Sequence, residues 1–191
     1  MISSPNEFLI TSLPRCRTAW LTNLFLTERT HCFHILSASH NYHEMQELFR
    51  ETGKEYVGIC EPDSLFCQFT DYLDFVSKTI PVVIIERPVD EALKAGLASS
   101  NFGFIDLQTK LMEDRVGWIQ VIKQQFENVL VFQMSELSTK NICTIWKHCV
   151  PNIEIDLMRL EQLQELQITS KCCDNDSLNS HIKLHKNLKK R

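Results

Sequence analysis

The chain has 191 residues, of which 43% are hydrophobic and 23% charged, and its formal net charge at pH 7 is -4. This length and composition predict one compact domain with a substantial core and argue against two ordinary domains. The acidic balance argues against a protein that coats nucleic acid, and neither a secretion signal nor a run of about 18 apolar residues is visible, so we expect no membrane span.

Strand and helix signals alternate along the chain. In order, they predict a strand at 8–11, a helix at 18–27, a strand at 32–36, a helix at 41–52, a strand at 56–60, a helix at 64–78, a strand at 81–85, a helix at 89–98, a helix within 106–126, a strand at 129–133, and helices at 138–149 and 155–168. Gly53 closes the second predicted helix, and Asp63 is placed to cap the third.

The strand PVVII at 81–85 is continuously apolar, which is typical of a strand buried on both faces. Strands that alternate with helices predict an α/β fold, a three-layer sandwich with a central parallel sheet. In such sheets ligands bind beyond the carboxyl ends of the strands, so the loops that follow the strands are where we look for function.

The end of the sequence differs from the rest. Residues 169–191 lack a core-forming pattern and carry five cations in their last part, at Lys183, Lys186, Lys189, Lys190 and Arg191. We therefore expect a single domain over 1–168 and a flexible basic tail over 169–191, solvated rather than anchored to nucleic acid or membrane.

The eight cysteines are scattered, apart from the adjacent Cys172 and Cys173. None of them stands in a CxxC pair or in a Cys/His spacing suited to a metal, so we expect no structural zinc site. Scattered thiols fit a reducing compartment, and we expect a cytoplasmic protein.

The segment TSLPRCRTAW, residues 11–20, joins the first predicted strand to the first predicted helix. Backbone N–H groups at a helix start attract anions, and Arg15, Arg17 and the Thr18 hydroxyl add charge-assisted donors for a phosphate or sulfate. The pattern GxxxxGK[ST] is absent and no glycine precedes Gly53, which disfavours an ordinary P-loop kinase or GTPase. The residue six places after Cys16 is threonine, where a cysteine phosphatase needs arginine.

This loop resembles the 5′-phosphosulfate loop of sulfotransferases, whose pattern runs roughly aromatic or small, Pro, Lys/Arg, Ser, Gly, Thr, Thr/Ser, Trp/Leu. The matching positions here are Leu13, Pro14, Arg15, Cys16, Arg17, Thr18, Ala19 and Trp20. Pro14, Arg15, Thr18 and Trp20 fit the pattern. Cys16, Arg17 and Ala19 depart from its commonest form, and Ala19 removes one hydroxyl ligand to the phosphate.

Two further segments extend the resemblance. In the family, a strand ending in Arg and a Ser about eight residues later hold the 3′-phosphate of the donor. Arg87 matches, whereas position 95 is alanine, and Lys94, Ser99 or Ser100 are the candidates to replace the missing serine. Residues 118–149 resemble the family's helix, strand, Glu-Leu turn and last packing helix. Together the segments span about three quarters of the chain, from residue 8 to about residue 149.

The resemblance implies a P-loop NTPase-like, sulfotransferase-like fold and the co-substrate 3′-phosphoadenosine 5′-phosphosulfate, without a metal. The reaction would move a sulfuryl group in line onto a hydroxyl or amine acceptor, which the sequence does not identify. Residues 14–20, Arg87 and Lys94 would bind the donor. Arg15 takes the place of the catalytic lysine, and because arginine stays charged it would stabilise the leaving group electrostatically.

Glu61 is the candidate base, because the family's base is a His or Glu near the end of this strand and burial at a site mouth raises a carboxyl pKa. Trp20 has two open interpretations, stacking on adenine or packing in the core. For His31, His34, His40 and His43 a surface or helix-start role is favoured over catalysis.

Two alternatives to an active sulfotransferase stay open. The first is a non-catalytic nucleotide-binding or scaffolding protein of the same fold, favoured by Ala19 and by the absent serine at position 95. The second is a small nucleotide or metabolite kinase with an unusual phosphate loop, which a magnesium requirement would reveal. The sequence leaves the oligomeric state open.

Overall fold

The computed structural model describes residues 4–13, 16–36, 39–61, 67–99 and 105–166. Five parallel strands form one sheet in the order β2-β3-β1-β4-β5. The strands are β1 (Asn6–Ser12), β2 (Thr30–His34), β3 (Tyr56–Glu61), β4 (Val82–Glu86) and β5 (Val129–Gln133). The helices are α1 (Thr18–Leu24), α2 (Tyr42–Glu51), α3 (Cys67–Phe75), α4 (Val89–Ser99), α5 (Ile105–Gln125), α6 (Thr139–Cys149) and α7 (Leu157–Gln164).

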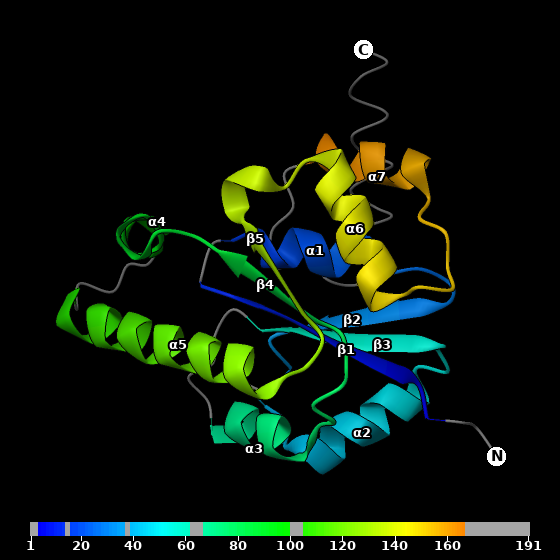
Figure 1. Ribbon diagram of the computed structural model, residues 1–191, viewed down its shortest axis with the longest axis horizontal. Coiled ribbons are helices and arrows are strands. Elements are labelled where there is room, and N and C mark those ends of the chain that lie inside the picture. The colour runs from blue at the N-terminus through cyan, green and yellow to red at the C-terminus, as the bar shows by residue number, and fades with distance from the viewer. Residues whose placement is uncertain (1–3, 14–15, 37–38, 62–66, 100–104, 167–191) are drawn as a thin grey trace.

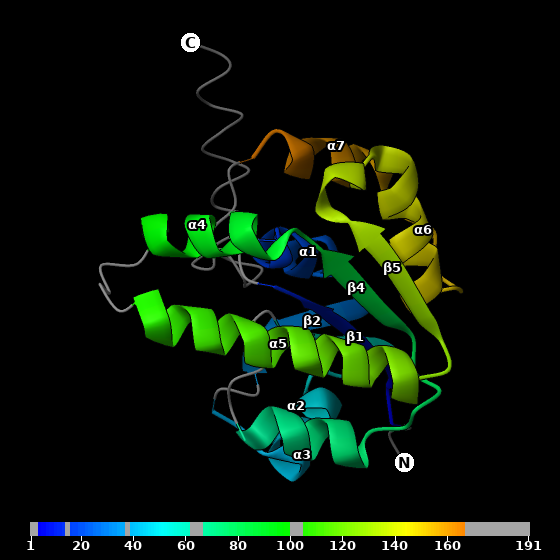
Figure 2. The same cartoon turned by 60° about the vertical axis from the view of Figure 1, so that its left-hand side comes forward.

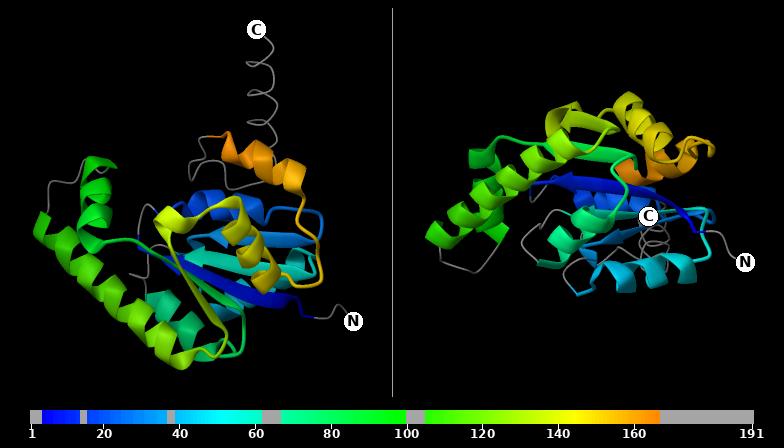
Figure 3. Two further views of the ribbon diagram at one scale, coloured as in Figure 1. Left: turned by 45° about the horizontal axis from the view of Figure 1, so that its top comes forward. Right: turned by 60° about the horizontal axis from the view of Figure 1, so that its bottom comes forward.

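Helices cover both faces of the sheet (Figure 1). Helices α1, α6 and α7 lie on one face, and α2, α3 and α5 lie on the other (Figures 1 and 2). Figure 3 shows the same three layers from two further directions. Helix α4 follows β4 and packs against α5. The predicted α/β class, with a parallel sheet between helical layers, is confirmed.

The predicted elements are all present among the described residues, with shifted ends. Strand β5 coincides with its prediction, whereas β2 ends at His34 rather than at Leu36. The reason is Ile35, whose φ of 58° is left-handed and cannot continue a strand. The predicted cap Asp63 and the predicted tail over 169–191 lie outside the described residues.

Local capping sets several helix starts. Helix α2 begins with a capping box, in which the Glu44 N–H donates to the Asn41 side chain and the Asn41 N–H donates to the Glu44 carboxylate. Ser138 caps α6 in the same position. Gly53 follows α2 with φ 62°, a conformation that glycine adopts without strain, so the chain turns there toward β3.

The core lies on both faces of the central strands. Phe8, Leu9 and Ile10 of β1 are fully buried, and so are the four apolar residues at 82–85 of β4. Burial on both faces explains why β4 reads as a continuous apolar run. The Phe25 ring stacks on Trp146 of α6 with their centroids 5.1 Å apart, which ties α6 to the end of α1.

Helix α1 is fixed against α7 by two side chains. The Trp20 indole N–H donates to the Leu163 carbonyl at 2.8 Å. The Arg159 guanidinium donates to the carbonyls of Asn23 and Leu26, at 3.1 and 2.6 Å, just where α1 ends. These contacts hold α1 in place against α7.

Free thiols are found at positions 16, 32, 60, 143 and 149. Within the described ranges, no helix combines the length and apolar character that crossing a membrane requires.

A candidate anion-binding crevice

The carboxyl ends of the three central strands meet where the chain changes direction. Strand β1 lies between β3 and β4, with Thr11 beside Glu61 and Ser12 beside Ile85. The chain leaves β1 toward α1 on one face of the sheet, whereas from β4 it passes through α4 to α5, which lies on the other face (Figures 1 and 2). In α/β proteins ligands bind beyond the strand ends at such a switch point, and the region beyond the carboxyl ends of β1, β3 and β4 is called the crevice below.

The loop from β1 to α1 borders this crevice. Cys16 is fully buried, Arg17 is exposed, and Thr18 begins α1 with only 6% of its surface accessible. Arg17 has φ 61°, and its carbonyl accepts the Leu21 N–H at 2.9 Å, so it starts the helix from a left-handed conformation. Pro14 and Arg15, both predicted to bind the donor, lie outside the described residues.

Arg87 brings a second positive charge to the same place. Burial raises the pKa of the Cys16 thiol to about 11, while the Arg87 charge and the Ser12 side chain act in the opposite direction. Arg87 follows β4, is partly buried, and lies 3.4 Å from Glu91 one turn along α4. Because Ser12 at the end of β1 pairs with Ile85 near the end of β4, Arg87 and the start of the β1–α1 loop lie close together, although they are far apart in sequence.

Glu61 ends β3 beside the crevice. Its side chain is fully buried, and the Thr11 hydroxyl of the neighbouring strand donates to its main-chain carbonyl at 3.0 Å. A buried carboxylate at the carboxyl edge of a sheet is unusual, because burial of a charge is costly. Glu61, the predicted base, thus stands at the edge of the sheet where ligands of α/β proteins bind.

Arg115 is the second buried charged residue in the described part of the chain, at 5% exposure. It stands in the apolar stripe of α5, with Met112, Ile119, Ile122 and Phe126, which are also buried. Lys123 lies about two turns farther along α5, roughly 12 Å, and its ammonium is 2.5 Å from the Glu86 carboxylate at the end of β4.

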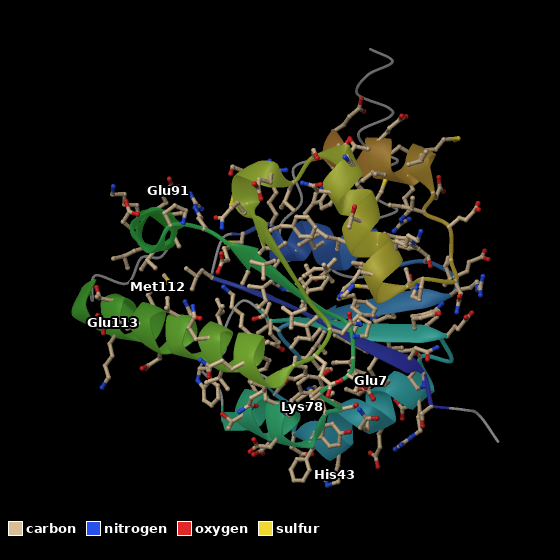
Figure 4. All side chains as sticks on the ribbon, viewed as in Figure 1. Glu7, His43, Lys78, Glu91, Met112 and Glu113 are labelled. Carbon is tan, nitrogen blue, oxygen red and sulfur yellow. The ribbon has the colours of Figure 1, made fainter. Side chains whose placement is uncertain are left out.

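Figure 4 shows Met112, one turn before Arg115, on the side of α5 that faces the end of β4 and α4. Sequence reasoning missed Arg115. The available signal was a single arginine at a core-facing position of an otherwise apolar helical stripe, which is rare unless the charge is paired or serves a site.

His34 was also missed. It ends β2, and its Nε2 atom lies 3.2 Å from the Thr18 hydroxyl. The predicted surface role did not consider that the carboxyl ends of parallel strands share one edge of the sheet. Reading His34 as the last residue of β2 would have placed it at the edge of the sheet where the chain leaves β1 for α1.

Three predicted binding residues have other surroundings. The Lys94 side chain is 79% exposed and lies 3.5 Å from Asp90 on the same helix. Trp20 is 8% exposed and bonded to α7, which accounts for its burial as packing. Ala19 is partly buried and carries no hydroxyl. Two serines, Ser99 and Ser100, were also candidates to replace the serine missing at position 95, and Ser100 lies outside the described residues.

No family model, curated protein or solved structure matches the chain. Among the described side chains, no three His, Cys, Asp or Glu residues converge as a metal ion would require. The assignment of function therefore depends on the residues of the crevice themselves.

Proposed function

We propose that the crevice binds 3′-phosphoadenosine 5′-phosphosulfate and that the chain transfers the sulfuryl group to a hydroxyl or amine acceptor. The observation that carries this proposal is the proximity of Arg87 to the β1–α1 loop at the switch point. Two anionic groups of one nucleotide would need two cationic contacts on adjacent strand ends. The same arrangement supports the finer fold assignment, P-loop NTPase-like and sulfotransferase-like.

In the proposed reaction, the acceptor oxygen or nitrogen attacks sulfur in line while the bond from sulfur to the bridging oxygen breaks. The leaving group is 3′-phosphoadenosine 5′-phosphate, which gains the negative charge. Arg15 and Arg17 are proposed to neutralise that charge, and Thr18 to donate a hydrogen bond to the 5′-phosphate. Glu61 is proposed to take the acceptor proton, since its buried carboxylate lies at the same edge.

Arg87 is assigned to the 3′-phosphate in this proposal. Lys94 contributes less than the sequence pattern suggests, because its ammonium is exposed and beside Asp90. Trp20 is assigned to the core, since its N–H group is already bonded to Leu163. Adenine would then stack on another surface of the crevice.

The test is calorimetric titration with 3′-phosphoadenosine 5′-phosphate, and with ATP in the presence and absence of magnesium. We expect Arg87→Ala to weaken binding by about 10- to 100-fold, the range for loss of hydrogen bonds to a charged group. The matched control is Arg29→Ala, because Arg29 pairs with Glu55 at the opposite, amino ends of the strands. Equal affinities for the Arg87 and Arg29 variants would contradict the assignment, and preference for ATP with magnesium would favour a kinase.

A non-catalytic nucleotide-binding protein is the second candidate, and the exposed Lys94 and the missing hydroxyl at Ala19 favour it. Turnover distinguishes the two. An enzyme should release 3′-phosphoadenosine 5′-phosphate from the sulfated donor when hydroxyl and amine acceptors are supplied, and Glu61→Gln should abolish the release while leaving nucleotide binding intact. Binding without release under any acceptor would support the second candidate.

A further inference from the structure

The contact between His34 and Thr18 joins the end of β2 to the first residue of α1. His34 Nε2 lies 3.2 Å from the Thr18 hydroxyl oxygen, and the Cys60 thiol donates to the Thr18 carbonyl at 3.5 Å. Cys60 and His34 are themselves paired across β3 and β2. The Thr18 side chain thus contacts β2, and the Thr18 main-chain carbonyl contacts β3.

The backbone on both sides of this contact is strained. Among the described non-glycine residues, positive φ values occur at Arg17, directly before Thr18, and at Ile35, directly after His34. A β-branched residue such as isoleucine rarely adopts this conformation. The Ile35 N–H donates to the Cys60 carbonyl at 3.1 Å, which fixes the turn after His34 against β3. Strain that the surrounding structure holds in place is typical of functional positions.

The direction of the His34–Thr18 hydrogen bond decides what Thr18 can bind. A threonine hydroxyl has one hydrogen to donate and accepts through its lone pairs. If Nε2 donates, the Thr18 hydrogen stays available for an anion. If Nε2 accepts, the Thr18 hydrogen is consumed and the hydroxyl presents only lone pairs, which repel an anion.

We propose that His34 is a positioning residue, whose Nε2–H group donates to the Thr18 hydroxyl and thereby aims the Thr18 hydrogen at an anionic oxygen bound in the crevice. The inference rests on the proposed function for the identity of that anion, the 5′-phosphate or sulfate of the nucleotide. His34 acts through Thr18 and needs no contact with the ligand. Its role resembles that of a residue that orients the ligand of a metal.

A double-mutant cycle tests whether His34 acts through Thr18, with calorimetric affinity for 3′-phosphoadenosine 5′-phosphate as the readout. We expect Thr18→Val to weaken binding about 10-fold or more, and His34→Ala about 5-fold. The double variant should bind as weakly as Thr18→Val alone, since without the hydroxyl there is nothing to position. His34→Gln, whose amide can donate at a similar reach, should recover most of the affinity. Multiplying losses in the double variant would overturn the proposal.

The matched control is His31→Ala. His31 lies on the same strand, three residues earlier, with its ring 4.4 Å from that of Phe33 and thus on the face opposite to His34. Its removal should change the affinity less than twofold. A loss equal to that of His34→Ala would point to a general disturbance of β2 and would overturn the assignment.

A measurement without ligand separates this inference from the proposed function. In nitrogen-15 NMR spectra of the ligand-free protein, His34 should carry its proton on Nε2, and Thr18→Val should shift the Nε2 resonance. An unprotonated Nε2 would overturn the inference even if the nucleotide binds. Failure of the wild-type chain to bind 3′-phosphoadenosine 5′-phosphate would instead refute the proposed function, while a protonated, Thr18-dependent Nε2 would still support the positioning contact.

Discussion

Gly58, in the middle of β3, has no room for a side chain. A Cβ atom built on this residue would lie 2.2, 2.4 and 2.5 Å from three carbons of the Phe8 ring on the neighbouring strand. Carbon atoms that are not bonded prefer separations of about 3.5–4.0 Å, so the ring would have to move by more than 1 Å. Phe8 is fully buried, and its ring centroid is only 4.7 Å from that of Phe25, so little space is available for that movement.

We therefore expect Gly58→Ala to lower the free energy of unfolding by about 2–3 kcal/mol, the upper part of the range for overpacked cores. Urea denaturation followed by circular dichroism measures this change. With an m-value of about 2 kcal/mol/M, the midpoint should fall by about 1 M. The loss should be smaller, by at least about 1 kcal/mol, when Phe8→Leu is already present, because the shorter side chain relieves the clash.

Gly117 is the matched control. It is an exposed residue in α5, and a Cβ atom there would have no neighbour within 4 Å. Gly117→Ala should raise the free energy of unfolding by about 0.5–1 kcal/mol through helix propensity. A Gly58→Ala variant within about 0.5 kcal/mol of the wild type, or an equal loss in both Phe8 backgrounds, would refute the packing described for β1 and β3.

Three further predictions concern single side chains. Burial raises the pKa of Glu7 above its ordinary value of 4.5, despite the hydrogen bond from Gln46, so the folded state disfavours the carboxylate. Glu7→Gln should therefore be more stable than the wild type at pH 7. Denaturation at several pH values should show that this difference in stability vanishes below about pH 4.5. Trp20→Phe should lower the free energy of unfolding by about 1–2 kcal/mol, because the hydrogen bond to the Leu163 carbonyl is lost. Its calorimetric affinity for the nucleotide should stay within twofold of the wild type, and a large loss of affinity would favour the interpretation that Trp20 stacks on adenine. The buried Cys16 thiol, with a pKa of about 11, should be alkylated only slowly by iodoacetamide at pH 8.5 in the native protein, as peptide mass spectrometry would show. Arg87→Ala should raise that pKa further. Rapid alkylation of the native protein would contradict the burial of Cys16.

The strands could be predicted where a short apolar run stands between polar residues. The apolar run at 80–85 lies between Thr79 and Glu86, the apolar run at 129–132 lies between Asn128 and Gln133, and both became strands close to the predicted limits. Strand order was not predictable in this way, because pairing between β1 and β4 depends on contacts between residues more than 60 apart in sequence. The misplaced end of β2 has a single cause, since nothing in its composition marks Ile35 as left-handed.

Residues of the candidate site that stand together in one loop could be predicted from the sequence, whereas residues that only the fold brings together could not. The cations and Thr18 of the β1–α1 loop stand together in the sequence, and Arg87 follows an obvious strand. His34 reaches the same edge of the sheet only through the parallel pairing of β2 with β3. The Lys94 ammonium lies 3.5 Å from the Asp90 carboxylate, one turn earlier on an exposed helix face, and this i,i+4 spacing was visible in the sequence.

The central claim is that a nucleotide binds at the switch point beside β1 and β4. Amide hydrogen exchange with and without 3′-phosphoadenosine 5′-phosphate, read by mass spectrometry, tests the location directly. The account predicts added protection in peptides covering 11–20 and 86–91, with those covering 27–31 and 53–57 at the amino ends of the strands unchanged. Protection confined to other segments, or none at saturating nucleotide, would contradict the claim.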